Sequence, residues 1–211
     1  MSYSSVLTAG GTRDHLFASD PPRIDGDVLT WSDQRLACSM TLRRRSPRFE
    51  RKLVDGVSWR CEMPAADAEL HIEGKKVRGR GYAELLELTI APWDLPIDEL
   101  RWGRFCGDRL SLVWIDWRGS HPLTLVLLDG AAVDGSVSDR TIIAGDATLS
   151  IGDGAVIRSA AIGDSIPFLE PFLPKRMTAA TEHKWCSRST VSRGGQNVDR
   201  GWAVHEIVRF A

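Results

Sequence analysis

Three carboxylates of this sequence fall on strand faces that are otherwise apolar. Because successive side chains of a strand point to opposite faces, period-two alternation shows which residues share a face. This alternation groups Glu84, Asp116 and Glu206 each with large apolar neighbours. A carboxylic acid in apolar surroundings has a raised pKa, since burial disfavours the anion, and near neutral pH it can donate a proton. We therefore expect Glu84 and Asp116 to be catalytic acids and Glu206 to line the same site.

An arginine beside such an acid would change this expectation. Arg101, Arg104 and Arg118 are available for pairing, and a guanidinium next to a carboxylate lowers the pKa of the carboxyl. A paired acid, or one that reaches water at a strand end, would be structural rather than catalytic. Arg101 or Arg104 could instead orient a polar end of a ligand, so the sequence leaves both interpretations open.

Tryptophans gather around two of these acids. Residues 79–119 hold four of the eight tryptophans in the chain. An aromatic face attracts positive charge through its quadrupole, so acids and aromatic rings together suit the protonation of a carbon–carbon double bond. The residues expected to shape such a pocket or hold its ligand are Tyr82, Trp93, Arg101, Trp102, Arg104, Trp114 and Glu206.

The elements that must position these residues are short strands. Period-two alternation covers residues 36–42, 82–90 and 110–117, and an apolar run covers residues 123–128. Frequent turn signals, many of them Asp-Gly, separate such runs, which is typical of an all-β chain. Part of the second run also consists of good helix formers, but glycines and Pro92 bound a short segment, which favours a strand.

The second half of the chain continues this pattern. Residues 147–151 and 155–162 are expected to form strands on either side of a Gly-Asp-Gly turn, and residues 185–192 and 202–210 to form a terminal hairpin. Residues 166–174 contain three prolines, so they cannot form a long regular element. We expect them to form a lid loop or a dimer contact.

A chain of many antiparallel strands and few helices must close or stack its sheets to hide the strand edges. A barrel of eight or more strands can hold an apolar ligand. No linker or internal repeat divides the sequence, so we expect one domain over residues 1–211. The predicted fold is an all-β antiparallel barrel with an apolar pocket.

The charge balance gives no case for a nucleic-acid partner. Lys and Arg number 27 against 28 Asp and Glu, a net charge of -1.

The four cysteines form no Cys-x-x-Cys pair and no signal peptide precedes them, so we expect reduced thiols in a cytoplasmic protein. No apolar run can span a membrane, although peripheral membrane contact, a monomer and a homodimer all stay open. No two histidines have the spacing of a metal site, and the sequence contains no nucleotide-binding motif. We therefore expect no metal and no other cofactor.

The order of several motifs resembles a known family. These motifs are Trp59, Met63-Pro64-Ala65, Gly79-Arg80-Gly81-Tyr82, Leu100-Arg101-Trp102-Gly103-Arg104-Phe105 and Trp114 to Trp117. They resemble the carotenoid 1,2-hydratase (hydroxyneurosporene synthase) and AttH-like group, which is related to the tocopherol cyclases. The resemblance lies mainly in residues 59–119. It implies a lipocalin-like (calycin) barrel that binds an isoprenoid or terpenoid molecule, protonates a double bond, and then adds water or closes a ring.

Three functions follow from these observations. The first is a cofactor-independent enzyme of biosynthesis, a cyclase, hydratase or isomerase, that acts on an apolar small molecule through Glu84 or Asp116. The second is a lipocalin-like carrier of a lipid or pigment, in which the acids are rim residues. The third is a structural β-sandwich whose core is filled.

Overall fold

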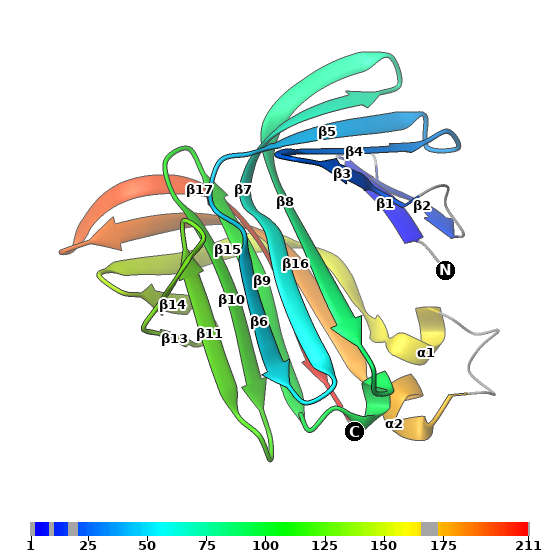
Figure 1. Ribbon diagram of the computed structural model, residues 1–211, viewed down its shortest axis with the longest axis vertical. Coiled ribbons are helices and arrows are strands. Elements are labelled where there is room, and N and C mark those ends of the chain that lie inside the picture. The colour runs from blue at the N-terminus through cyan, green and yellow to red at the C-terminus, as the bar shows by residue number, and fades with distance from the viewer. Residues whose placement is uncertain (1–2, 9–10, 17–20, 166–172, 211) are drawn as a thin grey trace. The chain divides into compact units, whose positions relative to one another are not determined.

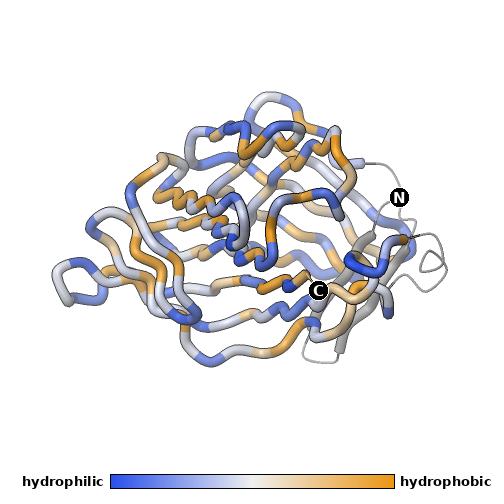
Figure 2. The backbone as a smooth tube through the Cα atoms, turned by 90° about the horizontal axis from the view of Figure 1, so that it is seen from below, coloured by the Kyte–Doolittle hydropathy of each residue, from blue (hydrophilic) through white to orange (hydrophobic). Residues whose placement is uncertain are grey.

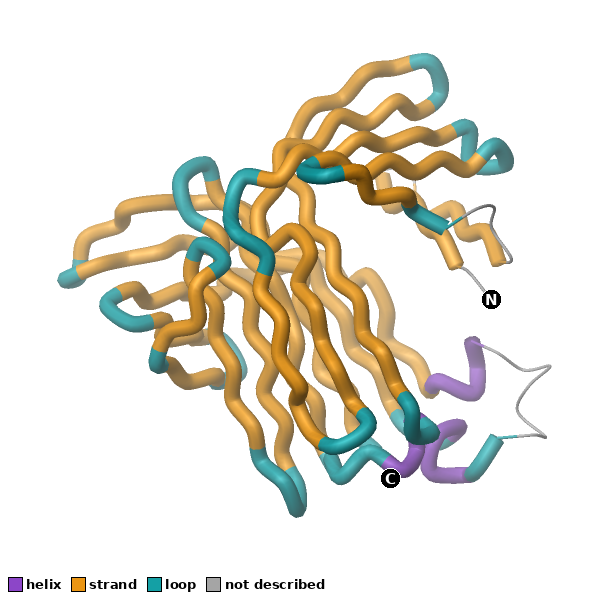
Figure 3. Tube along the Cα trace, in the orientation of Figure 1, coloured by secondary structure: helices purple, strands orange, loops and turns teal. Residues whose placement is uncertain are grey.

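Antiparallel strands make up most of the chain, as the sequence predicts (Figure 3). The computed structural model describes residues 3–8, 11–16, 21–165 and 173–210, and the side chains of residues 21–164 and 173–210 among them. The predicted lid, residues 166–174, lies almost entirely outside the described residues. Apolar residues recur along strand after strand (Figure 2). The prediction of an all-β antiparallel chain is therefore confirmed.

Contacts between Cα atoms divide the chain into two compact units. Unit 1 consists of residues 1–46 and 65–82, and unit 2 of residues 47–64 and 83–211. Two strands, β7 (Val57–Ile72) and β8 (Lys75–Leu88), run from one unit into the other. The expectation of a single domain stays a prediction.

Unit 1 is built from hairpins. Its strands outside the shared pair are β1 (Tyr3–Thr8), β2 (Gly11–Leu16), β3 (Arg23–Asp25), β4 (Val28–Asp33) and β5 (Cys38–Arg44). β1 pairs with β2, and β3, β4, β5 and β7 follow one another in a second sheet. Leu42 is buried at the centre of this sheet. A Cβ on Gly81 would lie 2.3 Å from Cδ2 of Leu42, so glycine is needed where β8 passes this side chain.

The main element of unit 2 is a nine-stranded antiparallel sheet (Figure 1). Its order is β12 (Ala131–Val133), β11 (Leu123–Leu128), β10 (Ser111–Arg118), β9 (Glu99–Gly107), β17 (Gln196–Arg209), β16 (Thr181–Arg193), β15 (Ala147–Ala161), β14 (Thr141–Ala144) and β13 (Gly135–Val137). β13 and β14 also contact β11, so the sheet curls back toward itself. Its edge strands do not pair with each other within the described residues, and a closed barrel is therefore not formed.

Within the part of unit 2 that the structure describes, the remaining elements are one further strand and three short helices. β6 (Phe49–Val54) pairs with the first half of β7, and β8 pairs with β7 as well. The helices are the 3₁₀ turn η1 (Pro92–Asp94), α1 (Ile162–Ser165) and α2 (Lys175–Thr178). No helix within the described ranges is both long enough and apolar enough to cross a membrane.

The curled sheet encloses an apolar core on its concave face. The buried residues of this core are Phe105, Leu112, Trp114, Val126, Ile142, Ala144, Ala147, Leu149, Ile151, Val191 and Ala203. β10 is buried on both faces, because Ile115 and Trp117 on its other face are only 4% exposed. Burial of both faces means that an alternating pattern in β10 does not separate core from solvent. It separates two different apolar environments.

The Gly-Asp-Gly segment is not a turn, and the prediction of two strands around it is wrong. β15 runs through it, with an irregularity in its pairing with β16 between Ile151 and Gly154. A Cβ on Gly152 would lie 2.6 Å from the carbonyl oxygen of Arg188, and one on Gly154 would lie 2.2 Å from Oγ of Ser187. The two glycines therefore let β16 approach a bulge in β15, which is a use of glycine that resembles a turn signal in sequence.

The predicted terminal hairpin is confirmed, as β16 and β17 around Gly194 and Gly195. The four cysteines are free thiols. Cys38 and Cys61 are buried, whereas Cys106 and Cys186 are partly exposed.

Gly103 is a position where the packing of unit 2 can be tested. A Cβ there would lie 2.3 Å from Cζ2 of Trp114 and 2.8 Å from Cβ of His205. Gly103→Ala should destabilise the protein by about 1–3 kcal/mol, because a core that is already full must shift. Urea unfolding followed by tryptophan fluorescence measures this. Gly79→Ala is the matched control, since no atom lies within 4 Å of the added methyl, and equal stability of the two variants would contradict the described packing.

Candidate functional site

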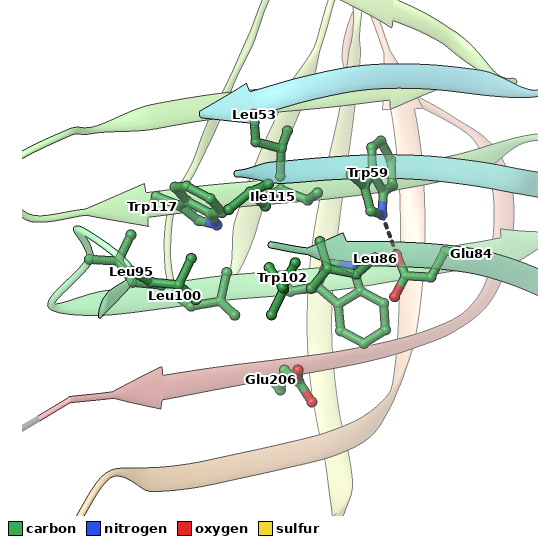
Figure 4. A pocket seen from close by; sticks show the side chains of 13 residues that line it. Leu53, Trp59, Glu84, Leu86, Leu95, Leu100, Trp102, Ile115, Trp117 and Glu206 are labelled. Carbon is green, nitrogen blue, oxygen red and sulfur yellow. Dashed lines mark hydrogen bonds between the residues drawn. The ribbon is translucent and has the colours of Figure 1, made fainter. Parts of the chain in front are cut away.

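An apolar pocket in unit 2 lies on the convex side of the nine-stranded sheet, between it and β6, β7 and β8 (Figure 4). We call it the aromatic pocket. It encloses about 150 Å³. Its lining is Leu53, Val57, Trp59, Glu84, Leu86, Leu88, Leu95, Ile97, Leu100, Trp102, Ile115, Trp117 and Glu206. Two carboxyl groups and three indoles thus lie within one apolar lining.

Glu84 is fixed by an indole. The Nε1–H group of Trp59 donates a hydrogen bond to Oε2 of Glu84, with the two atoms 2.5 Å apart. Trp59 is on β7 and Glu84 on β8, so the bond links neighbouring strands. The alternation that placed Glu84 with Leu86 and Leu88 is confirmed, because all three line the pocket.

Glu206 belongs to a chain of ion pairs that continues across β16 to Arg158 of β15. Nζ of Lys184 lies 2.5 Å from Oε2 of Glu206 and 3.0 Å from Oε1 of Glu182. Nε of Arg158 lies 3.2 Å from Oε2 of Glu182. Lys184 and Glu206 are directly opposite in the β16–β17 ladder, so both side chains project from the same face of the sheet.

The charges in this chain follow from burial and pairing. Burial raises the pKa of Glu206, and the opposing charges of Lys184 and Arg104 do not cancel this effect. Burial acts to lower the pKa of Lys184, but Glu206 and Glu182 outweigh it, and the pKa of the ammonium is raised. Lys184 therefore stays charged, while Glu206 holds its proton to a higher pH than an exposed glutamate does.

Trp102 is the aromatic neighbour of Glu206. The two residues are directly opposite in the β9–β17 ladder. The guanidinium carbon of Arg104 lies 5.4 Å from the centroid of the Trp102 ring, within the range of a cation–π contact. Arg104 also lies near Cys186, whose thiol pKa is raised by burial and lowered less by Arg104. An aromatic face, a partly buried acid and a guanidinium thus lie close together at the pocket.

Three of the predicted site residues lie on the opposite face of the same sheet. Trp114 belongs to the concave core. Asp116 is 6% exposed and is bound by Nε of Arg118 at 2.9 Å and by Oγ1 of Thr124 at 2.7 Å. Arg101 binds Glu99 and Asp139. The arginine partner that the sequence left open is therefore present at Asp116, and Glu84 and Asp116 do not share a pocket.

The other two predicted residues lie outside the pocket lining. Trp93 is in η1, where its carbonyl oxygen accepts a hydrogen bond of 2.7 Å from Arg176. Tyr82 is the last residue of unit 1. Of the residues named from the sequence, Glu84, Trp102 and Glu206 line the pocket, and Arg104 contacts it through Trp102.

Several residues of this site were not predicted as such. The sequence motifs include Trp59 and Trp117 but predict no site role for either. No sequence motif includes Lys184 or Glu182. An alternating pair of charges opposite Glu206 in the hairpin was the available indication, but it needed the strand register.

Comparison with known proteins identifies the fold. No model of a known protein family matches the sequence, and no curated protein matches it either. Among solved structures, CghA with Sch210972 overlays with a TM-score of 0.54 at 10% identity, over 95% of this chain and 76% of CghA. The chain shares the fold of CghA.

Two further structures give weaker overlays. Kievitone hydratase from Nectria haematococca has a TM-score of 0.49 at 10% identity, over 87% of this chain and 65% of the hydratase. A Nitrosomonas europaea protein provisionally named AttH has a TM-score of 0.46 at 14% identity, over 99% of this chain and 68% of its own. At such identities the likeness to CghA concerns the fold alone.

Proposed function

We propose that this chain is a hydratase-type enzyme that protonates a carbon–carbon double bond of an apolar, terpenoid-like molecule in the aromatic pocket. The observation that supports the proposal is the presence of Glu84 and Glu206, from different strands, in one lining with Trp59 and Trp102. A pocket that only stored hydrocarbon would gain nothing from two partly buried carboxyl groups, because burying them costs free energy.

In the proposed reaction Glu206 is the acid. Although Lys184 pairs with it, burial outweighs this pairing and the pKa of the Glu206 carboxyl stays raised. Its carboxyl O–H gives a proton to one alkene carbon, the π bond breaks, and positive charge develops on the other carbon. The indole of Trp102 stabilises that charge through its face. Water then adds to the cation and loses a proton to Glu84, which gives hydration. Attack by a second double bond instead of water, followed by loss of a proton to Glu84, would give cyclisation, and direct loss of a neighbouring proton to Glu84 would give isomerisation. In each case proton exchange with solvent restores Glu206 and Glu84.

The proposal also places the fold within the lipocalin-like group. Strands from both sheets of unit 2 surround an apolar pocket, which is the arrangement in which such folds hold small ligands. Membership in the hydratase and AttH-like family is part of this proposal, as is a role in biosynthesis without a cofactor. Asp116 has no part in the pocket, because it lies on the other face of β10.

Incubation with defined polyenes tests the function. We expect farnesol or geranylgeraniol to return with one added water, or with unchanged mass and altered chromatographic retention. Liquid chromatography with mass spectrometry measures both outcomes, and a sample without protein is the control. Return of every bound polyene unchanged would contradict the enzyme and favour a carrier, and failure of all of them to bind would contradict the pocket.

A further inference from the structure

A second cavity lies on the concave face of the nine-stranded sheet. It encloses about 340 Å³, and none of its lining residues lines the aromatic pocket. His205 and Ile207 of β17 line it, whereas Glu206 between them lines the aromatic pocket. Ser187 and Trp185 of β16 line it as well. One sheet therefore carries a lined cavity on each face, and we call this second one the serine–histidine cavity.

Its central polar pair is a hydroxyl next to an imidazole. Oγ of Ser187 lies 3.0 Å from Nε2 of His205. The His205 ring stacks on Trp185, with centroids 5.2 Å apart and planes inclined by 22°. This stacking fixes the plane of the imidazole. Burial lowers the pKa of His205, so the ring is neutral near pH 7 and one of its nitrogens can accept a proton.

A bulge in β15 lies beside this pair. The residues of the bulge, Gly152 to Gly154, line the same cavity. Two of them, Gly152 and Asp153, have no counterpart in the register with β16. A β-bulge leaves its extra residue outside the ladder, and backbone N–H groups outside a ladder can stabilise a negatively charged oxygen. The cavity thus combines a hydroxyl, a neutral base and irregular backbone.

We propose that this cavity is a second catalytic site, in which Ser187 is a nucleophile and His205 its general base, acting on small esters. Oγ of Ser187 attacks the carbonyl carbon, and its proton passes to Nε2 of His205. The bond from carbon to the leaving alcohol breaks, and His205 returns the proton to the alkoxide. Water then hydrolyses the acyl-serine by the same path and releases the carboxylic acid. Asp139, Arg140 and Asp153 share the lining with Ile151 and Ile207, so the cavity suits a small acyl group better than a long hydrocarbon chain.

Covalent labelling tests this site directly. We expect diisopropyl fluorophosphate to add once to the wild-type chain, on the peptide that contains Ser187, and the protein to release 4-nitrophenol from 4-nitrophenyl acetate. Ser187→Ala should abolish both. His205→Gln should slow both by about 10²–10⁴-fold, because it removes the base. Peptide mass spectrometry and absorbance measure the two effects.

Ser189→Ala is the matched control. Ser189 is buried on the same strand and face, but its hydroxyl donates to the carbonyl oxygen of Ser187 and does not contact His205. This variant should label and hydrolyse like the wild type. Absence of an adduct on Ser187 in the wild type overturns the proposal without any variant. So does labelling of His205→Gln at the wild-type rate, with circular dichroism confirming that it is folded.

Discussion

Glu206→Gln should lower the turnover of a polyene by about 10²–10⁴-fold, the usual contribution of a general acid. Glutamine keeps the size of the side chain, but its amide is not acidic enough to protonate an alkene. Burial raises the pKa of Glu206, so the wild-type rate should fall only as pH rises through a pKa above that of an exposed glutamate. The residual rate of the variant should not show this fall. Initial rates between about pH 4 and pH 9, bracketing the ordinary glutamate pKa, measure both effects.

Asp116→Asn is the comparison for this experiment. Asp116 is also a buried acid of the nine-stranded sheet, but it faces the concave side and is held by Arg118 and Thr124. Turnover per folded molecule should be preserved in this variant. Full activity of Glu206→Gln, or an equal loss in Asp116→Asn, would show that the acid has been assigned to the wrong residue.

Ile142→Ala should destabilise the protein by about 2–5 kcal/mol. Ile142 on β14 is fully buried in the concave core, and its truncation removes apolar contacts and leaves a cavity. Ile143 is the next residue on the same strand and is 44% exposed. Ile143→Ala should therefore change the free energy of unfolding by no more than about 0.5 kcal/mol.

Chemical unfolding followed by circular dichroism compares the two variants. They differ only in which face of β14 loses a side chain, so composition and strand propensity are matched. A larger loss at Ile143 would mean that the register of β14 against β15 is shifted by one residue, and similar losses in both would contradict the described burial of Ile142.

Local patterns in the sequence were sufficient to predict the strands and the faces of single residues. Alternation placed Glu84 with Leu86 and Leu88, and Asp116 with Trp114, as the structure has them. The pattern could not show which face of a strand meets which environment. Because β10 is buried on both sides, an acid on an apolar face is compatible with the filled core as well as with the pocket.

Which residues meet at the site depends on how neighbouring strands are aligned. The pattern within a single strand gives no information about this alignment. Trp102 is opposite Ile115 in the β9–β10 ladder, and so Trp102 and Trp114 point to opposite faces. Counting back from the two-residue turn of the terminal hairpin would place Lys184 opposite His205. An irregularity next to Val191 moves the register by one residue and places Lys184 opposite Glu206.

The burial of β10 on both faces has a consequence for how the chain finds its native pairing. In most strands a slip of one residue is penalised at once, because it turns apolar side chains out to water. A slipped β10 would still bury apolar residues on both sides, so that penalty is small. Correct pairing is instead favoured by shape, since Gly103 of β9 leaves room for the Trp114 ring opposite it, whereas a slip of one residue would place this ring opposite Trp102 or Arg104. The absence of a side chain at Gly103 thus distinguishes the native register of β9 and β10 from a slipped one.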